Sequence, residues 1–234
     1  MNRKLMFVLV LSLIVVLSFG VAAKMIDGTY SLEGKVDSHG NYPTITIVVK
    51  DGKLASVDYK EIISSENSPK TKDNYSWEPY FTAVETLEKK AVEENGDVSK
   101  LDAVASATSS SVKLKDMLLA VQLQAVSLKN AVYPSLEGTA SHGYIPKLTI
   151  TVAGGKISKV EYFDYNEKTG KPKHEDEYAW PKYFEAIEYF SDTTVKENGN
   201  IMAIDAVAGA TGTSNTFFSL YRTLLNMILK AAKQ

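Results

Sequence analysis

The chain contains an internal repeat, which constrains its fold more than any other feature. Residues 102–111 read DAVASATSSS and residues 205–214 read DAVAGATGTS, so the two stretches lie 103 residues apart. The same offset relates the flanking sequence from His39 and His142 onward without a net insertion. Register kept over this length indicates duplication of a whole folding unit. We therefore predict two similar domains, at residues 24–130 and 131–234.

The composition agrees with two folded domains and excludes several classes of function. A chain of 234 residues gives each half about 100 residues, which is enough for a hydrophobic core. The net charge of −2 gives no reason to expect nucleic acid as a partner. The sequence has no Cys, which excludes disulfides, thiolate metal sites and iron–sulfur clusters, and with three His we expect no metal site.

The first 23 residues have the pattern of an export signal. Arg3 and Lys4 precede an apolar run that ends in small residues, so we predict a secretory signal peptide cleaved after Ala23. The alternative is an uncleaved membrane anchor, because residues 5–23 approach the roughly 17 to 25 residues that a membrane span needs. Either reading predicts that the rest of the chain lies outside the cytoplasm.

Each half has the pattern of a β-hairpin followed by helices. In the first half, Asp51 and Gly52 separate two apolar strands at residues 45–49 and 54–59, and Asp-Gly is typical of a two-residue hairpin turn. The equivalent strands of the second half are residues 148–152 and 157–162, joined through Gly154 and Gly155. We predict an α+β fold of two tandem homologous domains, each an antiparallel sheet with packed helices.

Two amphipathic helices are predicted in each half. The first ends at an Asn-Gly step, Asn95 in one half and Asn198 in the other, which is typical of a helix C-terminus. The second begins at the hydroxyl residues of the repeated motif. In the first half we expect this helix to run into residues 127–133, with Asn130 and Pro134 marking the linker between the domains.

The repeated motif has the chemistry of an anion site. An Asp, a run of small residues and several hydroxyls stand directly ahead of each second helix. Small residues let a ligand approach the backbone where a helix exposes its unpaired N–H groups. The alternative is that these Thr and Ser residues are ordinary N-caps. Two copies at equivalent positions favour the anion site, and we expect the hydroxyls of Ser110 and Thr213 to be accessible within two or three residues of each helix start.

The motif also resembles the flavinylation motif of the FMN-binding domain family, whose members include membrane redox subunits and secreted bacterial flavoproteins. In that family a flavin transferase esterifies the last hydroxyl of the motif to the phosphate of FMN. The resemblance covers both repeats and implies these cofactor-binding residues: Thr213, Thr211, Asp205, Gly209 and Ala210 in the second, and Ser110, Thr108 and Asp102 in the first. Ala105 and Ala208 stand where the family has a hydroxyl, and Ser106 where it has Gly. The second copy thus follows the pattern more closely, and the sequence leaves open whether the first carries flavin.

The resemblance implies an extracytoplasmic electron carrier, secreted or anchored to the outer face of the cytoplasmic membrane. Such a protein would be the substrate of an FMN transferase rather than an enzyme, with a membrane redox donor or acceptor as partner. The alternative is a non-redox module that binds FMN or another phosphorylated ligand reversibly. A hydrolase has no support, because no catalytic triad or carboxylate pair stands in a motif.

Aromatic residues and histidines recur at equivalent positions of the two halves. Tyr75, Trp77, Tyr178 and Trp180 stand where a polar loop meets a helix, and they could wall a planar ring, although helix-face aromatics are more often core. His39 and His142 each stand in a Ser-His-Gly step. A turn residue is the favoured reading of both, ahead of a ligand or proton donor.

Overall fold

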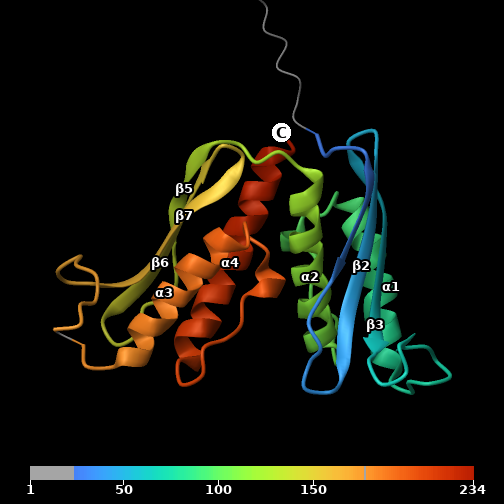
Figure 1. The fold of residues 1–234 in the computed structure, drawn as a ribbon, viewed down its shortest axis with the longest axis horizontal. Coiled ribbons are helices and arrows are strands. Elements are labelled where there is room, and N and C mark those ends of the chain that lie inside the picture. The colour runs from blue at the N-terminus through green and yellow to red at the C-terminus, as the bar shows by residue number, and fades with distance from the viewer. Residues whose placement is uncertain (1–23, 177) are drawn as a thin grey trace, which may run out of the picture.

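The computed structural model describes residues 24–176 and 178–234, which form two sheet-and-helix units (Figure 1). The fold is α+β, as predicted. The first unit contains β1 (Gly28–Glu33), β2 (Asn41–Lys50), β3 (Lys53–Ile63), β4 (Ser68–Pro69), α1 (Glu78–Glu93), the 3₁₀ turn η1 (Val98–Lys100), α2 (Thr108–Gln122) and the 3₁₀ turn η2 (Leu123–Ala125). The second contains β5 (Ala131–Glu137), β6 (Tyr144–Ala153), β7 (Lys156–Asn166), α3 (Pro181–Lys196), the 3₁₀ turn η3 (Ile201–Ala203) and α4 (Thr211–Ala232).

Both predicted hairpins are confirmed. The strands β2 and β3 pair antiparallel around Asp51 and Gly52, whose φ angles of 55° and 74° give the left-handed backbone that a two-residue turn requires. Gly154 and Gly155 adopt the same conformation between β6 and β7. The sheet orders are β1-β2-β3-β4 and β5-β6-β7, so the equivalent strands β2 and β6 each lie between two neighbouring strands.

The 103-residue offset holds for the elements themselves. The strands β2 and β6 begin at Asn41 and Tyr144, and the helices α2 and α4 begin at Thr108 and Thr211. The alignment shifts only in the outer strand, where the pairing of β5 with β6 is irregular between Tyr133 and Leu136. Two residues of β5, one of them Pro134, take the place there of a single residue in β1. Pro cannot donate a ladder hydrogen bond, so within sheets it is found at irregularities of edge strands such as this one.

The expected course of the chain between the units was therefore wrong in two respects. Helix α2 ends at Gln122, followed by the short turn η2, and does not continue into residues 127–133. Pro134 lies inside β5 and not in a linker, because Ala131 and Tyr133 already pair with Val152 and Ile150 of β6. Pairing with an apolar strand thus overrides the local signal of Asn130 and Pro134.

Each sheet is covered on one face by the two helices of its own unit. Alternate residues of the central strands are buried, Ile45, Ile47 and Val49 in β2, and β6 follows the same pattern. The Asn-Gly steps end α1 and α3 as predicted, with Asn95 and Asn198 at φ 49° and 45°. Their side chains also accept hydrogen bonds from the backbones of Leu54 and Ile157, which ties each helix end to its hairpin.

The two units meet through α2 and α4, which lie side by side at the centre of the molecule (Figure 1). Arg222 of α4 donates two hydrogen bonds, of 2.7 and 2.8 Å, to the carboxylate of Asp116 in α2. Asp97 accepts from Asn226 and from Lys230, both at 2.7 Å. The turn η1 of the first unit packs against α4, and η3 of the second packs against α2. The turn that leads into each motif therefore rests on the other unit.

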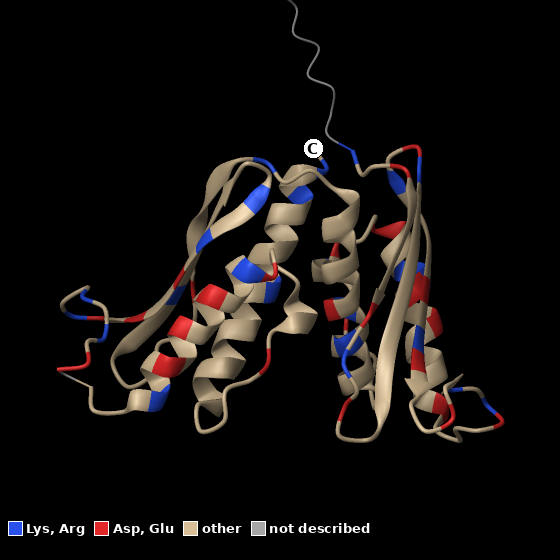
Figure 2. Ribbon diagram, in the orientation of Figure 1, with Lys and Arg blue, Asp and Glu red and all other residues tan. Residues whose placement is uncertain are grey.

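Acidic and basic residues are interspersed along the ribbon of both units in Figure 2, in keeping with the small net charge. From residue 24 onward, the described helices do not combine the length and the apolarity that crossing a membrane requires. The predicted signal peptide or anchor falls on residues 1–23, which lie outside the described part of the chain.

Replacing Asn226 by Ala is expected to lower the free energy of unfolding by about 2 kcal/mol, because the backbone N–H of Val98 and the carboxylate of Asp97 each lose a buried partner. Urea unfolding measures the change. Thr223→Ala, at an exposed position of the same helix, serves as the control and should stay within about 0.5 kcal/mol of wild type. Equal effects of the two substitutions would contradict the assigned role of Asn226.

Candidate functional site

Helix α4 begins directly after the small residues of the second motif. Ala210 occupies the N-cap position, and its methyl side chain offers no acceptor to the first turn. The first helical hydrogen bond runs from the Ser214 N–H to the Ala210 carbonyl, at 2.9 Å. The N–H groups of Thr211, Gly212 and Thr213 therefore have no acceptor within the helix, and they stand at its positive end.

The motif loop holds its own shape through one buried hydroxyl. Ser214 donates from Oγ to the Ala210 carbonyl at 2.9 Å and accepts at 3.1 Å from the Val207 N–H. Gly209 turns the loop with a φ of 80°. Ser214 is thus committed to the structure of the loop, whereas Thr211 is exposed and Thr213 is half-buried.

A cavity of about 520 Å³ lies beside Thr213. Ligand pockets in proteins span about 300 to 1,000 Å³, so its volume suits a small organic molecule. Its walls are formed by the start of α4, the start of β6, the end of β7, the loop before β6 and the loop after β7. The residues that line it are Thr139, Ser141, His142, Tyr144, Pro146, Tyr162, Asp164, Lys173, Tyr178, Gly212, Thr213 and Thr216.

One wall of the cavity carries a cation held among aromatic rings. The Lys173 ammonium is 2.9 Å from the carboxylate of Asp164. It also lies 4.5, 4.3 and 4.7 Å from the ring centroids of Tyr144, Tyr178 and Tyr183. The Lys173 side chain is only 10% exposed, so this arrangement is fixed by packing. The cavity thus offers flat aromatic surface, one buried cation and a helix N-terminus.

Tyr162 connects the floor of the cavity to the motif. Its hydroxyl donates a 3.2 Å hydrogen bond to the backbone carbonyl of Thr213. Burial raises the pKa of Tyr162 far above its ordinary value, so the phenol stays protonated and remains a donor. The bond fixes the backbone of Thr213 to β7 and leaves its side-chain hydroxyl free of this contact.

The structure brings together only some of the residues that the second motif predicted for the site. Thr213 lines the cavity, while Thr211 and Gly209 are exposed on the adjoining loop and Ala210 is buried at the N-cap. Asp205 is not among the lining residues. Its carboxylate pairs at 2.7 Å with Lys35 of the first unit, and its backbone N–H donates to the Tyr189 hydroxyl.

The first motif has the same backbone framework but a different surface. Ser111 takes the role of Ser214, with hydrogen bonds to the Ala107 carbonyl and the Val104 N–H. Thr108 and Asp102 are exposed. The expectation that the Ser110 hydroxyl would be accessible was wrong, since this residue is only 8% exposed.

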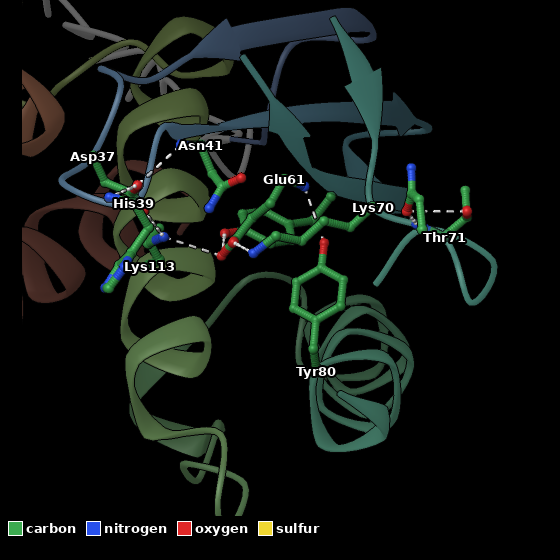
Figure 3. Close-up of polar contacts among 10 residues, drawn as sticks. Asp37, His39, Asn41, Glu61, Lys70, Thr71, Tyr80 and Lys113 are labelled. Atoms are coloured by element: carbon green, nitrogen blue, oxygen red, sulfur yellow. Dashed lines mark hydrogen bonds and ion pairs between the residues drawn. The ribbon is translucent and has the colours of Figure 1, made fainter. Parts of the chain in front are cut away.

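An ion cluster forms around Lys113, which lies three residues after Ser110 on α2 (Figure 3). The Lys113 ammonium lies 2.9 Å from a carboxylate oxygen of Asp37 and 3.1 Å from one of Glu61. The other oxygen of Glu61 accepts from Lys70 at 2.6 Å. Burial would raise the pKa of the Glu61 carboxyl, but the hydrogen bonds and charges of Lys70 and Lys113 hold it below its ordinary value. The pKa of Asp37 is lowered in the same way, against the effect of its own burial.

The aromatic and histidine predictions divide between the two units. Tyr178 lines the cavity, but the exposed Trp180 does not. In the first unit, Trp77 is also exposed, and Tyr75 packs against Lys70. The favoured reading of His142 as a turn residue agrees with its φ of 51°, although the same residue also lines the cavity. His39 lies in the turn that precedes β2, where its backbone N–H donates to Asp37.

Sequence reasoning missed Lys173, Asp164, Tyr162 and Tyr144. The first three have chemically similar partners 103 residues earlier, at Lys70, Glu61 and Tyr59. A search for charged residues that recur at the repeat offset would therefore have found the Lys173 and Asp164 pair. Tyr144 gives no such signal, because Asn41 takes its place in the first half.

A second cavity, of about 560 Å³, lies between α2 and α4, away from the motif hydroxyls. Its lining includes Arg222 and Lys230, whose charges are already paired with Asp116 and Asp97. The cavity at Thr213, by contrast, includes the free N-terminal donors of α4. We therefore place the candidate site at Thr213.

The fold and this cavity define an α+β protein with a ligand site at a helix N-terminus. Residues 143–226 match the model of the FMN-binding domain, a range that runs from the start of β6 into α4 and contains Thr213. Residues 143–226 are thus similar to an FMN-binding domain, and this match indicates FMN as the cofactor. The CPE2226 protein from Clostridium perfringens, known from a crystal structure, is 30% identical over 43% of this chain and 88% of that chain, with a TM-score of 0.38. No curated protein matches the chain.

Replacing Gly209 by Ala is expected to lower the free energy of unfolding by about 1 kcal/mol, because a residue with Cβ resists a φ of 80°. A Cβ there would meet only Lys182, in ordinary contact at 3.6 Å, so the cost lies in the backbone. The equivalent Ser106 already adopts a φ of 63°, so Ser106→Gly should stabilise the protein by up to about 1 kcal/mol. Urea unfolding of both variants measures the two changes, and changes of the same sign would contradict this reading of the loop.

The ion cluster of the first unit predicts a specific dependence on pH. Because the pKa values of Glu61 and Asp37 are lowered by folding, their stabilisation is complete above their ordinary values of 4.5 and 3.8 and is lost as the pH falls through the lower, folded values. Lys113→Met should therefore cost about 2 kcal/mol at pH 7 and progressively less below pH 4. Urea unfolding between pH 7 and pH 3 tests this, with Lys72→Met, which removes an exposed pair, as the control. A difference from wild type that is constant with pH would contradict the prediction.

Proposed function

We propose that the protein is an extracytoplasmic flavoprotein that carries FMN on Thr213 through a phosphoester and acts as an electron carrier at the cell envelope. The observation that carries this proposal is the position of Thr213. It lies half-buried at a 520 Å³ cavity and at an uncapped helix N-terminus, within the region that matches the FMN-binding domain. Each of these features suits a residue that must be reached by a transferase and must then hold a phosphate.

The residues of the cavity fit the parts of FMN. The N–H groups of Thr211, Gly212 and Thr213 are suited to a phosphate, as helix N-termini generally are. Tyr144 and Tyr178 offer flat surface to a planar ring, and the Lys173 cation lies between them. FMN supplies the redox chemistry when it is bound, and the chain's own residues hold and orient it.

Covalent attachment needs an activated donor. In the proposed reaction, a bond forms between Thr213 Oγ and a flavin phosphate, while the pyrophosphate bond of a flavin dinucleotide breaks and the nucleoside monophosphate leaves. The hydroxyl proton passes to a base on the transferase or to water. The chain supplies only the acceptor hydroxyl, so it is a substrate in this step and a carrier afterwards.

The proposed location is supported by residues 1–23, whose basic start, apolar run and small residues are typical of a secretory signal or an N-terminal anchor. An ester link suits such a location, because a protein outside the cytoplasm cannot recapture a cofactor that diffuses away. A membrane redox protein is the expected donor or acceptor of electrons.

Reversible binding is the second candidate function. The uncapped helix N-terminus and Lys173 can attract a phosphate without any ester bond, so the cavity itself favours a non-covalent module as much as a covalent one. The two candidates differ in what survives denaturation. Flavin that stays with acid-precipitated protein is covalent, and flavin that is released is not.

Replacing Thr213 by Ala is expected to abolish covalent flavin in full-length protein that is co-expressed with an active FMN transferase. Intact mass should show one FMN adduct on the wild type and none on Thr213→Ala. Asn215→Ala changes an exposed side chain two residues later, outside the cavity, and it should keep the adduct. If Thr213 were only a helix-terminal residue, its substitution would cost about 1 kcal/mol and leave flavin content unchanged. Unmodified Thr213 in a peptide map of the wild type would defeat the covalent proposal and favour reversible binding.

A further inference from the structure

The two motifs share a backbone framework, yet Lys113, three residues after Ser110, pairs with Asp37 and Glu61, whereas the equivalent residue of the second unit is Thr216. We propose that Lys113 determines which half of the chain accepts the cofactor, because its side chain occupies the counterpart of the Thr213 cavity and restricts the protein to one FMN. This inference rests on the proposed function, since it takes the Thr213 cavity as the FMN site.

Lys113 and Thr216 occupy equivalent places. Each is the sixth residue of its helix, α2 or α4, and each lies three residues after the candidate acceptor, Ser110 or Thr213. Residues three apart share one face of a helix, so position 113 faces the same space as its acceptor. In the second unit Thr216 lines the cavity with its short side chain. In the first unit the longer Lys113 reaches Glu61 of β3, and the residue equivalent to Glu61, Asp164, lines the cavity of the second unit (Figure 3).

The partners of Lys113 differ between the halves in a matching way. Glu61 occupies the position of Asp164, and each binds the equivalent lysine, Lys70 or Lys173. The second carboxylate of the cluster, Asp37, has Ala140 at its equivalent position, so the second unit lacks this partner for a cation. The extra lysine and the extra aspartate thus occur together in the first unit.

The hydroxyl at the cavity floor also changes partner. Tyr59 donates to the Glu61 carboxylate at 3.1 Å, whereas the equivalent Tyr162 donates to the backbone of Thr213. The tyrosine hydroxyl therefore binds the ion cluster in the first unit and the backbone of the acceptor residue in the second. The same backbone framework thus supports two different hydrogen-bond networks.

The cluster is satisfied and neutral, which makes it a poor site for an anion. Lys70 and Lys113 balance Glu61 and Asp37, and the Glu61 and Lys70 side chains are only 3% and 6% exposed. A ligand that displaced Lys113 would leave a buried carboxylate with fewer partners, which is costly. It would also place its phosphate near two carboxylates. Ser110 is itself only 8% exposed, so its hydroxyl is closed to a transferase.

The forward test opens the first site. A full-length triple variant, Ser110→Thr with Lys113→Thr and Asp37→Ala, gives the first unit the side chains of the second at these three positions. After co-expression with the transferase, intact mass should rise from one FMN adduct to two, and peptide mapping should place the new adduct at position 110. With Thr213→Ala added, the variant should keep one adduct where Thr213→Ala alone has none.

The reverse test closes the second site. Thr216→Lys with Ala140→Asp transfers the blocking pair and should remove the adduct from Thr213. It should also weaken the binding of free FMN to transferase-free protein at least tenfold, as measured by flavin fluorescence. Asn215→Lys adds the same charge at an exposed neighbouring position outside the cavity, and should keep both the adduct and the binding. Circular dichroism checks that each variant is folded. If the forward variant does not fold, the reverse variant alone tests the role of Lys113.

Different experimental results would overturn the two proposals. Wild-type protein with two adducts, a folded forward variant that stays at one, or a reverse variant that loads as well as the wild type would overturn the role of Lys113 and leave flavin on Thr213 in place. Wild-type protein without flavin on Thr213, either covalent or reversibly bound, would overturn the proposed function, and the role of Lys113 with it.

Discussion

The unpaired donors at the start of α4 are the constraint on which the site depends. Every α-helix begins with backbone N–H groups that lack an intrahelical acceptor, and most helices satisfy them with a capping side chain. Here the N-cap is Ala210, and the nearest buried hydroxyl, on Ser214, is already engaged within the loop. The donors are therefore left to solvent or to a ligand, and the cavity beside them supplies the space for one.

A comparison of the two halves separates the features of the candidate site that both halves share from the side chains in which they differ. The serine that closes the motif loop, the left-handed turn before it and the start of the helix are the same in both halves. The side chains that face the ligand space are not, as Lys113 and Thr216 show. A duplicated framework can thus keep its fold while a single long side chain changes what its surface accepts.

Much of the fold could be predicted from the sequence, because turns and helix ends depend on neighbouring residues. The hairpin at Asp51 and Gly52 and the helix end at Asn95 are of this kind. Pro134 was misread, because its place in β5 is set by pairing with β6. The site was predicted only as far as Thr213. The partners of Asp205 and Lys113 lie 170 and 76 residues away along the chain, so local patterns could not reveal that one carboxylate turns to the other unit and that one lysine fills a cavity.

The reciprocal packing of η1 on α4 and of η3 on α2 gives the molecule the geometry of a symmetric dimer. In such an interface, the same patch on each partner contacts its counterpart on the other. A dimer of separate chains would dissociate on dilution, whereas here the partners are joined in one polypeptide. The first half can therefore act as a permanent subunit for the second, and it supports the turn that leads into Thr213 at any protein concentration.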